Sequence, residues 1–369
     1  MRYELTDLPL KSLLPALGEA EDQLARLDER VARSEVGAGF IERGHFFDAA
    51  ASMWVNGELV HVEDLVLRDA WMDIRTPTHE TVLAHGIVRA RRKIAAAPAG
   101  WPLTSAGLKA LRGRGLDEEL PEMGRGKGGE KLESSSDKED DDALAIEFAE
   151  IDAVLARSNR LLAGEVEAAP APVEATMVGD LMIRDPEWDE DERLGAWLDL
   201  MAEADRLPPS LGAALLWDAW EAIEPLERQH WLGQLLVAAY LRSRGKVGSH
   251  LLAFCVGLRA VPRERRRARD TSTRFLAFLD AMQAAASAGL KELDRLNLAK
   301  GQMERRLRGR RSSSTLPIAI ELFLSRPVVT AAMIAATGRI TPRGALNLID
   351  ELGVRELTGR GRYRAWGVL

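Results

Sequence analysis

Residues 327–353 read PVVTAAMIAATGRITPRGALNLIDELG, a run whose helix start and stop signals decide the fold of the C-terminal region. Thr330 is placed to N-cap a short helix over residues 331–336, because its hydroxyl can accept a hydrogen bond from a backbone N–H of the first turn. Gly338 then offers the left-handed conformation that favours the end of a helix. The first part of the run therefore predicts a short, capped helix.

A second helix start follows within the same run. Thr341 supplies a cap, and Pro342 takes the first helical position, where its missing N–H costs nothing. We expect this helix to extend to about Leu352. An apolar helix over residues 316–324 precedes the run and stops before Pro327. Three successive helices with a short turn between the last two are typical of a helix-turn-helix.

The last of these helices has two different faces. At about 100° per residue, one face carries the apolar residues Ala345, Leu348, Ile349 and Leu352. The opposite face carries three polar residues, Arg343, Asn347 and Asp350. We expect the apolar face to pack on the domain and the polar face to be free to read base edges.

Residues 354–366 are predicted to form a small β-hairpin, the wing of a winged helix-turn-helix. Their glycine-containing turn is flanked by β-prone residues. The hairpin carries four arginines, Arg355, Arg360, Arg362 and Arg364. They would lie beside a phosphate backbone if the last helix occupies the major groove.

The predicted partner is therefore double-stranded DNA. Base reading is assigned to Arg343, Asn347 and Asp350, the last as an acceptor for cytosine N4. Backbone contact is assigned to the four wing arginines and to Thr330 and Thr341. The alternative is a winged helix that serves protein contacts or dimerisation alone.

The distribution of charge favours DNA as well. The whole chain has 50 Lys and Arg against 57 Asp and Glu, a net charge of −7. From Lys246 onward, however, 23 basic residues face 10 acidic ones, a net of +13, which leaves −20 for residues 1–245. Such asymmetry is typical of a chain with one polyanion-binding end.

The basic residues also cluster in the sequence. One group lies at 259–269, and a second, just before the winged helix, comprises Arg305, Arg306, Arg308, Arg310 and Arg311. Each group could be a solvated helix face or a flexible joint. Beside a helix-turn-helix, the second group is predicted to contact the DNA backbone.

Composition also bounds the compartment and the chemistry. A single cysteine, Cys255, excludes an intrachain disulfide and fits a reducing cytoplasm. Neither a signal peptide nor a membrane-spanning segment is expected, and a nucleoid-associated cytoplasmic protein is predicted. The six histidines lack metal-ligand spacing, and there is no phosphate-binding glycine loop of Walker type. We therefore expect neither a metal nor a cofactor.

Four segments are expected along the chain. Residues 1–112 and 143–312 have helical periodicity and are predicted as two helical domains. Residues 113–142 between them are rich in glycine, serine and charge, and are predicted to form a disordered linker. Residues 313–369 form the winged helix-turn-helix.

Within the second helical domain, residues 207–226 read LPPSLGAALLWDAWEAIEPL. This stretch resembles the helix and loop entry of the Fic fold, whose members transfer AMP from ATP to protein hydroxyls. Many Fic-like proteins also end in a winged helix. The whole chain further resembles an uncharacterised group of helix-turn-helix proteins from plasmids and symbiosis regions of rhizobia. The resemblance implies a mainly α fold, a Fic-like helical scaffold followed by the winged helix.

The Fic motif itself is degenerate in this chain. The family has a histidine general base followed by a Gly-Asn-Gly-Arg anion loop, whereas this chain has Glu224, Pro225, Leu226, Glu227, Arg228, Gln229 and His230. Without glycines the backbone N–H groups cannot approach a phosphate closely, and the acidic residues would repel a triphosphate. We therefore do not expect an enzyme.

Together these observations predict a transcriptional regulator, acting as a homo-oligomer (dimer), on a catalytically dead Fic-like scaffold. A divergent AMP transferase that uses Glu224 or His230 as its base is the alternative. An interaction module that inhibits a partner protein is a third possibility.

Overall fold

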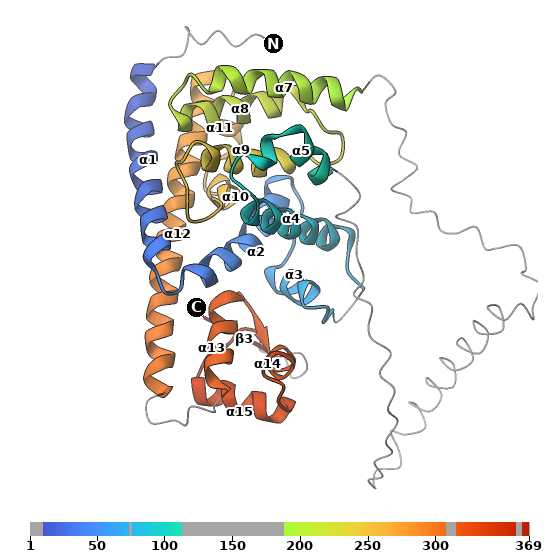
Figure 1. Ribbon diagram of the computed structural model, residues 1–369, viewed down its shortest axis with the longest axis vertical. Coiled ribbons are helices and arrows are strands. Elements are labelled where there is room, and N and C mark those ends of the chain that lie inside the picture. The colour runs from blue at the N-terminus through green and yellow to red at the C-terminus, as the bar shows by residue number, and fades with distance from the viewer. Residues whose placement is uncertain (1–9, 74–75, 113–187, 308–314, 359–363, 369) are drawn as a thin grey trace, which may run out of the picture. The chain divides into compact units, whose positions relative to one another are not determined.

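The computed structural model describes residues 10–73, 76–112, 188–307, 315–358 and 364–368 (Figure 1). Helices dominate these residues, which confirms the mainly helical fold class. The helical region comprises α1 (Leu10–Arg33), α2 (Gly37–Val55), α3 (Val62–Asp69), α4 (His79–Ala96), a 3-10 turn (Trp101–Leu103), α5 (Ser105–Arg112), α7 (Glu190–Ala204), α8 (Pro209–Ile223), α9 (Leu232–Ser243), α10 (Phe254–Leu258), α11 (Arg263–Arg266) and α12 (Thr271–Leu307).

The long helix α12 lies alongside α1 (Figure 1). With 37 residues it is about 55 Å long at 1.5 Å per residue. The buried residues of α1 recur every three or four positions, which gives one apolar stripe: Leu13, Leu17, Ala20, Leu24, Leu27 and Val31. Leu14 lies beside the stripe and is 57% exposed, because it is turned about 100° away from Leu13.

A buried ion pair joins three helices of this region. Asp48 of α2 pairs with Arg91 of α4, and each side chain is 1% exposed. The Asp48 carboxylate also accepts hydrogen bonds from the backbone N–H of Cys255 (2.7 Å) and of Val256 (3.3 Å), both in α10. Arg91 donates to the Leu251 carbonyl at 3.0 Å. These additional hydrogen bonds offset part of the cost of burying two charges, and they connect α2, α4 and α10.

The C-terminal region has the predicted winged-helix elements: α13 (Leu316–Ser325), β1 (Val329–Thr330), α14 (Ala331–Gly338), α15 (Pro342–Leu352), β2 (Arg355–Glu356) and β3 (Ala365–Gly367). The strands form an antiparallel sheet in the order β1-β3-β2. Trp366 of β3 lies between Val329 of β1 and Glu356 of β2. The hairpin prediction accounts for β2 and β3, and β1 is an addition, since a two-residue strand leaves almost no sequence pattern.

The turn between α14 and α15 differs from its sequence-based expectation. Helix α14 continues through Gly338, and the left-handed residue is Arg339, with φ of 51°. Its N–H and that of Ile340 both bond to the Ala335 carbonyl and close the helix. The prediction that Gly338 takes this conformation is therefore wrong by one residue. A non-glycine residue in this conformation costs roughly 1–2 kcal/mol.

The described residues before 113 and from 189 onward belong to one compact unit. The segments predicted as separate domains thus contact one another, and their boundaries remain a prediction. The predicted linker, residues 113–142, lies outside the described residues. No helix in the described ranges is long and apolar enough to cross a membrane.

Candidate nucleic-acid interface

Helix α15 is bounded by local signals at both ends. The Thr341 hydroxyl accepts a hydrogen bond from the Gly344 N–H at 3.1 Å and caps the first turn. At the other end Gly353 takes a left-handed conformation with φ of 57°, and its N–H bonds to the carbonyls of Ile349 and Asp350. Both ends are therefore closed without using side chains on the outer face of the helix.

The two faces of α15 separate as the periodicity predicts. Ala345, Ile349 and Leu352 are buried, and Leu348 is half-buried. Arg343, Asn347 and Asp350 are exposed on the opposite face, where Leu346 is also 37% exposed. Arg343 lies in the first turn, the part of a recognition helix that commonly reaches base edges in the major groove. The structure thus brings the three predicted base-reading residues together on one open surface.

The other capping prediction is confirmed at the start of α14. The Thr330 hydroxyl accepts a hydrogen bond from the Met333 N–H at 3.2 Å, while Thr330 also ends β1. The Thr330 hydroxyl therefore already accepts the capping hydrogen bond, and it would have to keep this bond while contacting a phosphate.

In the wing, Arg364 is held to the sheet. Its guanidinium donates to a Glu356 carboxylate oxygen from Nη2 at 2.7 Å and lies 5.0 Å from the centre of the Trp366 ring. The hydrogen bond from Arg364 lowers the pKa of Glu356. Arg355 on β2 is exposed. The predicted contacts Arg360 and Arg362 lie outside the described residues.

The arginines before the winged helix have different surroundings. Arg306 donates from Nη1 to the Leu352 carbonyl, at the end of α15, and thereby ties this helix to α12. Arg305 is exposed and bonds to the Gly301 carbonyl of its own helix at 3.0 Å. Both side chains are exposed, but Arg305 is bonded within its own helix whereas Arg306 reaches α15. Arg308, Arg310 and Arg311 lie outside the described residues.

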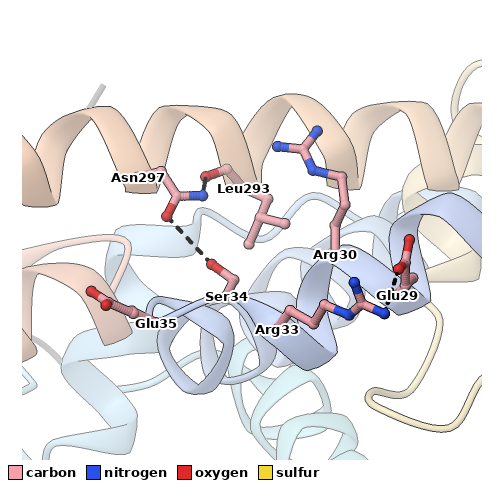
Figure 2. A pocket seen from close by; sticks show the side chains of 7 residues that line it. All are labelled: Glu29, Arg30, Arg33, Ser34, Glu35, Leu293 and Asn297. Atoms are coloured by element: carbon pink, nitrogen blue, oxygen red, sulfur yellow. Dashed lines mark hydrogen bonds and ion pairs between the residues drawn. The ribbon is translucent and has the colours of Figure 1, made fainter.

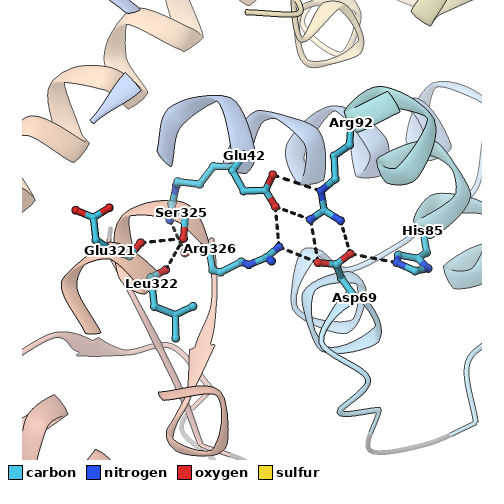
Figure 3. Close-up of polar contacts among 9 residues, drawn as sticks. Glu42, Asp69, His85, Arg92, Glu321, Leu322, Ser325 and Arg326 are labelled. Carbon is cyan, nitrogen blue, oxygen red and sulfur yellow. Dashed lines mark hydrogen bonds and ion pairs between the residues drawn. The ribbon is translucent and has the colours of Figure 1, made fainter. Parts of the chain in front are cut away.

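A cluster of four charged side chains joins the winged helix to the helical region (Figure 3). Arg326, directly after α13, donates from Nη1 to Glu42 at 2.9 Å and to Asp69 at 2.8 Å. Arg92 of α4 donates to the same two carboxylates. Both guanidinium groups also lie over the buried Phe46 ring, at 5.1 Å for Arg326 and 5.3 Å for Arg92. We call Glu42, Asp69, Arg92 and Arg326 the anchor cluster.

Two members of the anchor cluster, Asp69 and Arg92, stay ionised over a wide pH range. Burial alone would raise the pKa of Asp69, but hydrogen bonds from His85 and Arg92, together with the charges of Arg92 and Arg326, lower it well below its usual value. Burial alone would lower the pKa of Arg92, but its hydrogen bonds to Asp69 and Glu42 and the charges of these two carboxylates raise it. Protonation of Asp69 therefore does not release the winged helix near neutral pH.

Helix α13 is fixed at a second point. Arg43 of α2 is 1% exposed and donates to the backbone carbonyls of Phe323 (3.3 Å) and Arg326 (2.6 Å), which α13 leaves unpaired at its end. Nearby, a Cβ on Gly39 would lie 2.7 Å from the Leu324 carbonyl oxygen, so the absence of a side chain lets α2 and α13 approach closely. Sequence reasoning did not find Arg43, Gly39 or Arg326, because their partners are more than 240 residues away in the chain.

Residues 224–230, the degenerate Fic motif, form the connection between α8 and α9. Glu224 closes α8 in a left-handed conformation with φ of 47°. The indole of Trp220 donates to the His230 carbonyl at 3.1 Å, and Leu226 is buried. This connection offers no row of backbone N–H groups from glycines. In the described parts of the chain, no group of His, Cys, Asp and Glu side chains has the arrangement of a metal site.

Comparison with known proteins matches both the helical region and the winged helix. Residues 182–308 match a family model described as a protein of unknown function, DUF1612. Residues 316–369 match one described as an HTH DNA binding domain. The chain is also 44% identical to the protein of Sinorhizobium fredii named "Uncharacterized protein y4cF", over 387 aligned positions that cover all of both chains.

Proposed function

This chain belongs to the same family as protein y4cF, and we propose that it is a sequence-specific double-stranded DNA-binding protein that regulates transcription. The observation that carries the proposal is the outer face of α15. Arg343, Asn347 and Asp350 are exposed together on a helix whose opposite face is buried and whose two ends are closed. The match of residues 316–369 to an HTH DNA binding domain supports it.

We assign the contacts according to the surroundings of each side chain. Arg343 is suited to a bidentate contact with guanine and Asn347 to one with adenine, while Asp350 can accept from cytosine N4. Arg355 and Arg305 are exposed and suited to phosphates, and Thr341 lies at the exposed start of α15. Arg360 and Arg362 complete the proposed backbone contacts.

The helical region would then act as the platform for the reading helix. The anchor cluster, Arg43 and Arg306 hold the winged helix to α2, α3, α4 and α12. A platform of this kind is suited to present two winged helices at a fixed separation, and we propose a homodimer on DNA, in the cytoplasm and associated with the nucleoid. Two half-sites about one helical turn apart, roughly 34 Å, would be its footprint.

We further propose that the helical region is a Fic-like scaffold without catalytic activity. The connection at 224–230 offers neither the general base nor the glycine loop of an AMP transferase. The competing proposals are a divergent transferase and a protein-interaction module. A module of that kind would not need an exposed Asn347 beside Arg343.

The experiment is a selection of bound sequences from random duplex DNA by the full chain, followed by affinity measurements. Asn347→Ala or Arg343→Ala should lower the preference for one base pair by about 1–3 kcal/mol. Arg355→Ala should weaken binding to all DNA sequences by the same factor. Arg206→Ala, which replaces an exposed arginine in the helical region, should leave the affinity for DNA unchanged. Failure to enrich any sequence, or equal losses on specific and random DNA for all the α15 variants, would contradict the proposal.

A further inference from the structure

A cavity of about 370 Å³ lies where the helical region meets the winged helix. It is lined by residues of α2 and of the segment that leads into α3, including Phe47, Trp54 and Val60. The winged helix contributes Val328 beside β1, Leu357 after β2 and Val368 after β3. Its volume is within the range of small-molecule sites, about 300–1,000 Å³.

The walls of this cavity are mostly apolar, but three arginines line it. Arg259 is exposed, and its guanidinium lies 5.3 Å from the centre of the Trp54 ring. Arg43 and Arg295 share one carboxylate, that of Glu292. The Nε–H of Arg295 is buried without a hydrogen-bond partner within the described residues. With Glu63 as the acidic residue of the lining, positive charge is in excess in the cavity.

Another hollow, of about 440 Å³ between α1 and α12, provides a contrast (Figure 2). Its charged side chains are already paired: Arg33 with Glu29 at 2.9 Å, and Glu35 with Lys300 at 2.6 Å. Arg30, also in its lining, pairs with Asp294. A ligand there would have to compete with existing ion pairs and would find little apolar surface, so this hollow is not a candidate.

We infer that the cavity between the helical region and the winged helix binds a small organic anion with a flat apolar body, of the class of aromatic carboxylates. The apolar body would lie against Trp54, Val60 and Val328, and its carboxylate would pair with Arg259. The Trp54 ring can stack against the flat apolar body of such a ligand. The Arg259 guanidinium can form charge-assisted hydrogen bonds with its carboxylate.

The location gives the site a role that rests on the proposed function. Val328, Leu357 and Val368 connect it directly to the three strands β1, β2 and β3, and thus to the wing. A ligand that contacts both the helical region and the winged helix stabilises the arrangement in which the two lie at the distance that the ligand bridges. Its binding free energy then changes the affinity for DNA, and DNA changes the affinity for the ligand by the same factor.

The test uses titration calorimetry of the full chain with 2-naphthoate, with neutral 2-naphthamide and with acetate. We expect binding of 2-naphthoate, and binding at least tenfold weaker for the amide and for acetate. Arg259→Gln and Trp54→Ala should each raise the Kd of 2-naphthoate about tenfold or more, since both side chains are exposed and their loss leaves the core intact. Arg263→Gln, an exposed arginine outside the cavity, is the matched control and should leave the Kd unchanged.

Absence of binding at millimolar 2-naphthoate, or equal binding by the wild type and Arg259→Gln, would overturn the inference. The inference would also be overturned if sedimentation found a dimer that 2-naphthoate dissociates. The cavity would then be the contact site of a second copy of the chain. DNA affinity, measured with and without saturating 2-naphthoate, should change at least threefold, and an unchanged affinity would refute the coupling. Calorimetry needs no DNA, so a failure of DNA binding would contradict the proposed function and leave the ligand measurement valid.

Discussion

Replacement of Arg326 by methionine tests whether the anchor cluster holds the winged helix to the helical region. The substitution keeps much of the side-chain length and removes the charge. It deletes the hydrogen bonds to Glu42 and Asp69 and the contact with the Phe46 ring, and it leaves Arg92 as the remaining cation of the cluster. The Arg326 side chain is 25% exposed and Asp69 is 6% exposed, so the lost contacts are largely shielded from water.

The size of the effect follows from these contacts. Removal of one partner from a fully buried ion pair costs about 3–5 kcal/mol. Here the cost should be lower, because Arg92 still neutralises much of the charge on the two carboxylates and one side of the cluster is hydrated. We expect the winged helix to open from the helical region more easily by about 2 kcal/mol, which is roughly a 30-fold change in the opening equilibrium.

Hydrogen exchange measured by mass spectrometry reports this opening directly. Peptides from α13 to α15 should exchange about 30-fold faster in Arg326→Met, while peptides from the buried parts of α8 and α9 should be unchanged. Arg343→Met is the matched control, since it removes an exposed arginine of the same winged helix. Equal exchange in the two variants would refute the conclusion that the anchor cluster fixes the winged helix.

Three further expectations concern DNA, pH and catalysis. If about five phosphates are neutralised, log K for DNA should fall with log salt at a slope of about −4 to −5, and an affinity that does not respond to salt would contradict phosphate contact. Burial and the charges of Arg91 and Arg92 lower the pKa of His45 to about 2. The unfolded chain, with a histidine pKa of about 6.5, therefore binds the extra proton, and stability falls by about 1.4 kcal/mol per pH unit below that value. Denaturant unfolding at pH 5 and pH 7 should show that the free energy of unfolding falls less in His45→Gln than in the wild type. An equal fall in the two proteins would refute this role of His45. Finally, labelled ATP should give no AMP transfer to the chain or to lysate proteins, whereas incorporation that disappears in Glu224→Ala would establish the transferase instead.

The winged helix could be predicted from the sequence because its boundaries depend on neighbours in the chain. Thr330 and Thr341 each cap a backbone N–H three residues ahead, and Gly353 ends α15 with its own conformation. The apolar spacing of α15 likewise determines which face is buried. Such interactions are local, so residue type and spacing are enough to identify them. The one-residue error at Gly338 arose because backbone hydrogen bonds to Ala335 extend the helix to a less favourable residue, Arg339.

The sequence by itself therefore determined the three helices of the winged helix, the N-caps Thr330 and Thr341, and the exposed polar face of α15. Tertiary structure decided which arginines are free and which are engaged. Arg305 and Arg306 are adjacent, chemically identical and both exposed, yet Arg306 donates to the Leu352 carbonyl of α15 while Arg305 donates to the Gly301 carbonyl of its own helix. Arg326 likewise meets Asp69 across 257 positions of the chain. Pairing of this kind depends on how whole helices pack, and no local pattern in the sequence records that packing.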